Sequence, residues 1–101
     1  MISETGAVDQ PPNTTASWIV RTLTWVKRAM REGVPVEGYF VWTLTDNYEW
    51  NHGMSIRMGL YAVDKDDPQK TRVARSAVDA YGRIAQAGEI PRDLAKLYPA
   101  P

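Results

Sequence analysis

VEGYFVWTLTDNYEW, residues 36–50, joins an apolar run to a cluster of aromatic and acidic side chains, and it is the most informative segment of this 101-residue chain. Residues 36–44 are rich in β-branched and aromatic side chains, and they are apolar on both faces rather than alternating cleanly. Such a run is typical of a strand whose two faces are both covered, as in parallel sheets. We therefore predict a buried strand over 36–44, with residues 45–50 leaving its carboxyl end.

Two segments with helical spacing flank this strand. The first starts near Thr14 or Thr15, either of which can cap it, and ends at Gly33. The apolar stripe expected on it consists of Trp18, Ile19, Leu23, Trp25, Val26, Ala29 and Met30. The second helix is expected from about Arg72 to Gly88. Its stripe consists of Val73, Ala77, Ala80, Tyr81, Ile84 and Ala85.

The remaining segments complete an alternating order of loops, strands and helices. Residues 57–64 form a weaker extended segment, residues 64–67 a hydrated turn and residues 89–101 a short packed extension. A covered strand followed by a helix is the unit of α/β architecture, in which functional residues lie on loops after the carboxyl ends of strands. We predict one α/β domain over residues 1–101, with its functional site at 42–50.

Composition excludes several classes of function. Twelve Lys and Arg residues balance twelve Asp and Glu residues, so we expect no nucleic-acid partner and no anionic membrane surface. The lack of cysteine removes disulfides, thiolate metal sites and thiol catalysis, and it fits a reducing compartment. No leader-like segment and no apolar run near the roughly 20 residues of a membrane helix is present. We expect a cytoplasmic protein with no metal and no other cofactor.

Aromatic planes and carboxylates at a strand mouth are typical of a sugar-binding pocket. The C–H face of a sugar stacks on tryptophan, while its hydroxyl groups require acceptors such as carboxylates. Trp42, Glu49 and Trp50 supply both kinds of group. Without further information Trp42 fits a core position as well as a site, and Glu49 fits a surface acid.

Other polar residues near this segment have simpler interpretations. Asp46 and Asn47 are interpreted as structural residues that cap or form a turn. Arg57 could orient a carboxylate, but a structural role is favoured. His52 is the only histidine, and a single histidine indicates neither a metal site nor a base.

Three segments together resemble the C-terminal part of glycoside hydrolase family 1, the β-glucosidase and β-galactosidase family. They are ISETG at 2–6, VEGYFVWTLTDNYEW at 36–50 and RMGLYAVD at 57–64. The corresponding family stretches read ITENG, GYFxWSLxDNFEW and RFGLxxVD, in the same order and at comparable spacing. The middle motif is highly specific, whereas the short glutamate motif alone would be weak evidence.

The resemblance implies a (β/α)8 TIM barrel of which this chain is a C-terminal fragment, about the last quarter. It would contain the end of strand seven at 2–4, helix seven, strand eight at 36–44 and helix eight. A complete barrel needs about 250 residues, so the remainder of the barrel would be required for activity. Strand eight alone has an unpaired edge and apolar faces, which predicts self-association or dependence on a partner.

The resemblance also implies a chemistry and a role for each site residue. Family members are retaining glycosidases that use two carboxylates. Glu4, which on its position alone would be a solvated loop acid, would be the nucleophile. Trp42 would form the platform under the sugar, Glu49 would accept hydrogen bonds from two hydroxyls, and the Trp50 indole would reach a third. The implied substrates are unphosphorylated β-D-glucosides or β-D-galactosides.

Two features leave a second interpretation open. The family's acid/base glutamate lies in an Asn-Glu-Pro motif that this chain lacks, and Thr5 stands where the family usually has asparagine. Met58 likewise replaces a usual phenylalanine, while Thr43 and Tyr48 are mild changes. The alternative is a non-catalytic sugar-binding or assembly fragment with an intact aromatic loop.

Overall fold

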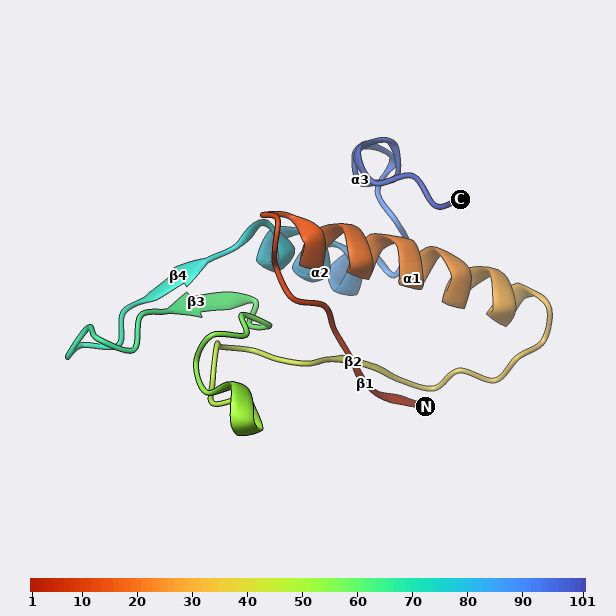
Figure 1. Ribbon diagram of the computed structural model, residues 1–101. Helices are drawn as coiled ribbons and strands as arrows, with labels where there is room; N and C mark the ends of the chain where they lie inside the picture. Colours follow the sequence, from red (N-terminus) through yellow and green to blue (C-terminus); the bar gives the residue numbers. More distant parts are fainter.

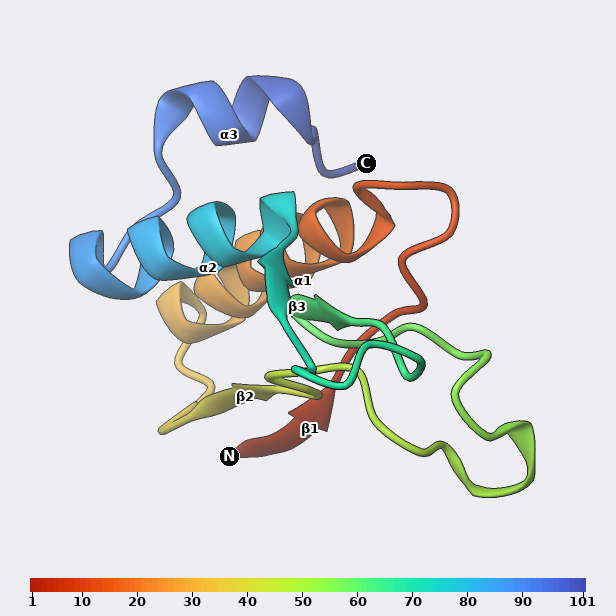
Figure 2. The same cartoon turned by 90° about the vertical axis from the view of Figure 1, so that its left-hand side faces the viewer.

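The computed structural model describes residues 1–101 as two small sheets and three α-helices (Figure 1). In order, the elements are β1 (Ile2–Thr5), α1 (Thr14–Arg31), β2 (Tyr39–Val41), the 3-10 turn η1 (Trp50–His52), β3 (Tyr61–Val63), β4 (Arg72–Ala74), α2 (Ser76–Ala87) and α3 (Arg92–Leu97). Figure 2 shows α1 and α2 as a middle layer, with the β1–β2 sheet on one side and α3 on the other. The predicted α/β class is therefore observed.

Strands β1 and β2 pair in parallel, as expected for consecutive strands joined by a helix. Ile2 is the register partner of Tyr39, and Thr5 is the partner of Val41. Beyond β2 the chain pairs with a different segment, because a parallel bridge joins Thr45 to Tyr61. The regular strand is thus three residues long, shorter than the predicted 36–44.

The prediction that both faces of this strand are covered is wrong for this chain. Phe40 is 54% exposed and Leu44 is 64% exposed, although both are large apolar side chains. The packed helix α1 covers one side of the two-stranded sheet (Figure 2), while no element of the chain covers the other. Exposed apolar surface of this kind is typical of sites that contact another protein, a membrane or a ligand.

Helix α1 has nearly the predicted bounds, but its buried stripe is different. The buried residues are Thr15, Ala16, Ile19 and Val20, whereas Trp18, Trp25 and Met30 are exposed. The helical period allowed two neighbouring stripes, and packing against α2 buries the one without tryptophan or methionine. On the exposed side, the Arg28 guanidinium lies 5.4 Å from the centre of a Trp25 ring, a cation–π contact.

The expected cap by Thr14 or Thr15 is also wrong. Asn13 is the N-cap residue, with a left-handed φ of 75°, and its side chain makes no capping bond. Instead Asp9 accepts a 3.0 Å hydrogen bond from the Thr15 amide, and the Thr15 hydroxyl donates to Ala7 O at 3.1 Å. Asp9, six residues upstream of Thr15, therefore supplies the acceptor for a free backbone amide in the first turn of the helix.

A hairpin occupies the place where the second helix was expected to start. Residues Arg72–Ala74 form β4, which pairs antiparallel with β3, so the predicted helical start at Arg72 is wrong. The Asp67 carboxylate accepts hydrogen bonds from the Gln69 and Thr71 amides at 2.9 Å each, and this closes the predicted turn. Helix α2 begins at Ser76 and ends at Ala87, with Gly88 as its C-cap, as predicted for the C-terminus.

The core lies where α1, α2, the start of β3 and α3 meet. Its buried apolar residues are Ala16, Ile19, Val20, Leu60, Ala77, Ala80, Ile84 and Leu94. Alanines on both helices allow α1 and α2 to approach closely, whereas the expected stripe residues Val73 and Ala85 are exposed. The tail packs through Leu94 of α3, as expected. None of the helices combines the length and apolarity that a bilayer crossing requires.

Candidate functional site

The structure joins two of the predicted site residues directly. Trp42 Nε1 donates a 2.9 Å hydrogen bond to Glu49 Oε1, across the loop that follows β2. Trp42 stays partly exposed, with 39% of its surface accessible, and the Trp42–Thr43 peptide bond is cis. An aromatic plane and a carboxylate therefore form one accessible unit at the carboxyl end of β2.

A turn at the end of this loop holds Glu49 in place. The Glu49 amide donates to Gly53 O at 2.8 Å, and the His52 amide donates to Glu49 O at 2.9 Å. Trp50, the first residue of η1, has a positive φ of 46° and is 86% exposed. Its indole makes no hydrogen bond, so the structure does not bring Trp50 into the Trp42–Glu49 unit.

Glu4 lies at the carboxyl end of β1, beside the start of the aromatic loop. The Trp42 amide donates to the backbone oxygen of Thr5 at 2.7 Å, which sets the two chain segments side by side. The Glu4 carboxylate is exposed and makes no hydrogen bond or ion pair. The hydroxyl of Thr5, the residue that departs from the family pattern, accepts a 3.0 Å hydrogen bond from Trp18 Nε1.

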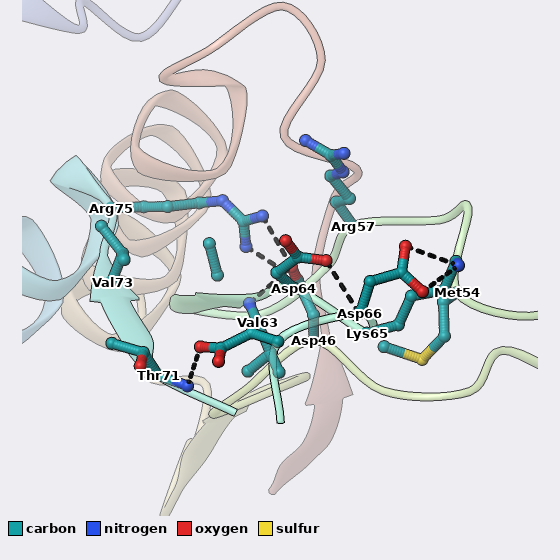
Figure 3. A pocket seen from close by; sticks show the side chains of 12 residues that line it. Asp46, Met54, Arg57, Val63, Asp64, Lys65, Asp66, Thr71, Val73 and Arg75 are labelled. Atoms are coloured by element: carbon teal, nitrogen blue, oxygen red, sulfur yellow. Dashed lines mark hydrogen bonds and ion pairs between the residues drawn. The ribbon is translucent and has the colours of Figure 1, made fainter. Parts of the chain in front are cut away.

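An ion cluster, which we call the Asp9–Arg75–Asp46 cluster, includes Asp46 of the loop that follows β2. Figure 3 labels two of its members, Asp46 and Arg75. The Arg75 guanidinium donates two 2.8 Å hydrogen bonds to Asp46, one to each carboxylate oxygen. Arg75 Nε also lies 3.5 Å from Asp9 Oδ2. The exposed side-chain fractions are 8% for Asp9, 12% for Arg75 and 4% for Asp46. All three charges are thus largely removed from water.

The environment of Asp46 favours its ionised form. Burial works to raise the pKa of Asp46, but hydrogen bonds from Arg75 and from two backbone amides outweigh it and hold that pKa below its usual range. The hydrogen bond with Asp46 in turn raises the pKa of Arg75. The amides belong to Gly59, at 2.9 Å, and Val63, at 3.3 Å. Asp46 is therefore a structural residue, as predicted, but it acts through a buried ion pair and long-range hydrogen bonds and not by capping or forming a turn.

Sequence reasoning missed Asp9 and Arg75. Arg75 falls in the stretch expected to be helical, and Asp9 lies in a loop with no recognisable motif. The only signal for a cationic partner was Asp46 itself. An acid with a structural role needs such a partner when it is buried. Which arginine supplies that partner depends on contacts between residues far apart in the chain.

A pocket of about 620 Å³ lies over the β3–β4 hairpin, with Asp46 of the loop after β2 among its lining residues. Acidic and basic side chains of the hairpin and its turn line it, together with Asp46, Arg57 and Arg75 (Figure 3). None of the four predicted site residues lines it. Arg57 makes no ion pair, and its backbone oxygen accepts a hydrogen bond from the Asp9 amide. No three His, Cys or acidic residues are grouped as a metal site requires.

Comparison with known proteins gives a consistent result. The model of Glycosyl hydrolase family 1 matches residues 10–90. A β-galactosidase from Sulfolobus acidocaldarius is 36% identical over 99% of this chain and 20% of its own length. A galactolipid galactosyltransferase from Arabidopsis thaliana is 32% identical over 91% of this chain and 15% of its own length.

Solved structures agree with the sequence matches. A β-glycosidase from Pyrococcus horikoshii superposes with a TM-score of 0.90 at 36% identity, covering 99% of this chain and 23% of that one. A β-glucosidase from Pyrococcus furiosus superposes with a TM-score of 0.87 at 40% identity, covering 97% of this chain and 20% of that one. The chain therefore spans about a fifth of the length of these relatives. The prediction of a partial (β/α)8 barrel is confirmed, and the chain belongs to glycosyl hydrolase family 1.

Proposed function

We propose that this chain supplies the nucleophile and part of the sugar-binding surface of a retaining β-glycosidase. Its substrates would be β-D-glucosides or β-D-galactosides, as the names of the relatives suggest. The observation that carries the proposal is the hydrogen bond between Trp42 and Glu49. It joins a stacking surface for a pyranose ring to an acceptor for that ring's hydroxyl groups.

The proposed binding step uses both groups at once. A pyranose stacks its C–H face on the Trp42 indole, while its hydroxyls donate to Glu49. One Glu49 oxygen already accepts from Trp42, and a carboxylate has about four lone-pair sites, so acceptor capacity remains for two hydroxyls. Charge-assisted hydrogen bonds of this kind discriminate strongly, because a sugar that lacks the hydroxyl leaves the carboxylate unpaired.

The proposed chemical step begins at Glu4. Its carboxylate attacks the anomeric carbon as the leaving oxygen takes a proton from a general acid, and a covalent glycosyl-enzyme forms. Water then attacks the anomeric carbon of that intermediate, the bond to Glu4 breaks and frees its carboxylate, and the same acid, now a base, accepts the proton of the water. A nucleophile must be accessible, which fits the exposed position of Glu4 at the end of β1. The general acid would come from another part of the barrel, about 5 to 5.5 Å away.

The experiment that tests this proposal is a chimera. Residues 1–101 replace the matching segment of the Pyrococcus horikoshii β-glycosidase, and the product is assayed with aryl β-glucosides and β-galactosides. Hydrolysis is expected, and Glu4→Gln should abolish it because an amide cannot act as the nucleophile. A folded chimera without turnover, or turnover that survives Glu4→Gln, would contradict the proposal. The 101-residue chain alone is expected to be inactive, since it lacks the Asn-Glu-Pro motif.

The choice between catalysis and sugar binding alone follows from the same chimera. Binding of glucose without any turnover would favour the non-catalytic interpretation. Asp66→Asn is a suitable control, because Asp66 is an exposed turn residue paired only with Lys65. It should leave the activity of the chimera unchanged.

A further inference from the structure

The Asp9–Arg75–Asp46 cluster joins three segments that are distant in the chain. Asp9 lies in the loop between β1 and α1, Asp46 follows β2, and Arg75 directly precedes α2. Arg75 adds two further contacts, donating from Nη1 to Gly59 O at 2.5 Å and from its amide to Leu60 O at 3.0 Å. One guanidinium group thus fixes the relative positions of all three segments.

Two of those segments carry the residues of the proposed site. Asp9 lies five residues after Glu4, and Asp46 lies between Trp42 and Glu49 in the chain. The cluster therefore connects the segment that carries the proposed nucleophile to the segment that carries the proposed sugar-binding unit. None of its members belongs to that unit.

The anchoring of Asp46 is stronger than that of the residues around Glu49. The Asp46 carboxylate accepts four hydrogen bonds, and the Asp46 amide donates to Tyr61 O at 3.0 Å. Glu49 has only local backbone bonds within the η1 turn, besides its side-chain bond to Trp42. The position of Glu49 relative to Trp42 therefore depends on the point where the loop is fixed, which is Asp46.

A purely stabilising role explains this arrangement less well. A buried ion pair gives little net stability compared with an apolar pair of similar volume, because removing both charges from water is costly. A bidentate contact between a guanidinium and a carboxylate does fix orientation, since two parallel hydrogen bonds define a plane. The Arg75–Asp46 contact has this geometry, at 2.8 Å for both bonds.

We infer that Arg75 is a positioning residue, which acts through Asp46 and Asp9 to hold the Trp42–Glu49 unit in place beside the strand that carries Glu4. The catalytic consequence of this inference rests on the proposed function. Its structural part does not, because the Trp42–Glu49 hydrogen bond can be observed in the chain without any substrate.

The test follows the indole N–H resonances of the four tryptophans by NMR, in the full chain with isotope-labelled tryptophan. Trp42→Phe identifies the Trp42 resonance, and Glu49→Ala gives its position without the acceptor. Arg75→Met should move the Trp42 resonance to that position and leave the Trp18 resonance unchanged. Arg75→Lys keeps the charge but loses the planar fork, so it should give an intermediate position.

The matched control is Arg72→Met, which removes an arginine three residues earlier in the chain, in β4. Arg72 is exposed, and its guanidinium donates only to Lys70 O at 3.3 Å, so all four resonances should stay in place. A Trp42 resonance that does not move in Arg75→Met overturns the inference. A shift that Trp18 shares also overturns it, because general loosening would then explain the result. If Arg75→Met does not fold, Asp46→Asn is judged by the same criteria.

A kinetic arm separates this inference from the proposed function. In an active chimera, Arg75→Met should lower kcat/KM by on the order of tenfold or more, because small displacements of binding groups are costly. Arg75→Lys should recover part of that loss. An inactive chimera would count against the proposed function alone, while the NMR result would still decide whether Arg75 positions Trp42 and Glu49.

Discussion

Trp42 Nε1 and Glu49 Oε1 lie 2.9 Å apart, so a tryptophan at the end of β2 and an acid seven residues later are held together by one hydrogen bond. The bond orients the carboxylate and leaves its second oxygen without a protein donor. The proposed sugar-binding surface is therefore organised by the chain itself. This pre-organisation reduces the entropy that ordering a flexible side chain would cost on binding.

The first prediction concerns the charge of Glu49. In the chimera, Glu49→Gln keeps the shape of the side chain but replaces a charged acceptor with a neutral amide. A hydrogen bond to a charged group contributes about 2 kcal/mol, so kcat/KM for an aryl β-glucoside should fall roughly thirtyfold. Steady-state kinetics measures this change. A value within twofold of the parent chimera would mean that Glu49 does not contact the substrate.

The second prediction concerns the pH dependence of stability. The pKa of Asp46 is lowered in the folded chain, so its contribution is complete above the unfolded pKa of about 3.9 and is lost as the pH falls through the lower folded pKa. The unfolding free energy of the parent chain, measured with urea, should therefore fall steadily from about pH 5 to about pH 2. Asp46→Asn should lower the unfolding free energy by about 3 kcal/mol at neutral pH, because Arg75 then loses a charged partner. The unfolding free energy of this variant should also depend less on pH in acid, because asparagine does not titrate.

The control for this series is Asp66→Asn, because Asp66 is an exposed acid in a surface pair. Its neutral-pH unfolding midpoint should match that of the parent chain. An Asp46→Asn curve that runs parallel to the parent at every pH would show that Asp46 does not titrate differently in the folded and unfolded states.

The third prediction concerns the exposed face of the β1–β2 sheet. Phe40 on β2 exposes a large apolar side chain there, Leu44 exposes another beyond the end of the strand, and a two-stranded sheet has free edges. We expect the 101-residue chain to self-associate with increasing concentration, as measured by sedimentation. Leu44→Lys should shift the distribution toward monomer, whereas Leu97→Lys, on α3, should not. A parent chain that sediments as a monomer at all concentrations would contradict this expectation.

Much of the fold could be predicted because it depends on local pattern. The helical spacing, the Gly33 and Gly88 ends and the apolar run before Trp42 all lie within short windows of sequence. The parallel pairing of β1 and β2 came from the family resemblance of both segments. The joint role of Trp42 and Glu49 was predicted from a specific motif, whereas without the family resemblance Trp42 fitted a core position as well as a site.

The errors share a different cause, which is contact between distant residues. β4 is only three residues long, and Arg72 is one of them. It forms because the Asp67 carboxylate closes a turn that returns the chain to β3. The buried stripe of α1 depends on which face meets α2, and the period permits either face. Arg75 could not be assigned, because its partners lie 29 and 66 positions away in the sequence.

The fourth prediction compares two glycines that differ in their surroundings. A Cβ on Gly59 would lie 2.2 Å from the Asp46 amide nitrogen and 2.5 Å from the Thr45 carbonyl carbon, so the loop after β2 would have to move. Gly59→Ala should therefore cost at least about 2 kcal/mol of unfolding free energy, as overpacking of a tight contact does. A Cβ on Gly82, in the middle of α2, would meet no atom within 4 Å.

Gly82→Ala should accordingly raise the unfolding free energy, by about 0.5 to 1 kcal/mol, because alanine loses less backbone entropy in a helix. Both values come from urea unfolding of the same chain. The opposite signs are the decisive feature, since a chain whose loop after β2 packs loosely would tolerate both substitutions. Gly59→Ala should also displace the Trp42 indole resonance, because Asp46 fixes the loop that brings Glu49 to Trp42. Equal stability of the two variants would show that the close contact at Gly59 is absent in solution.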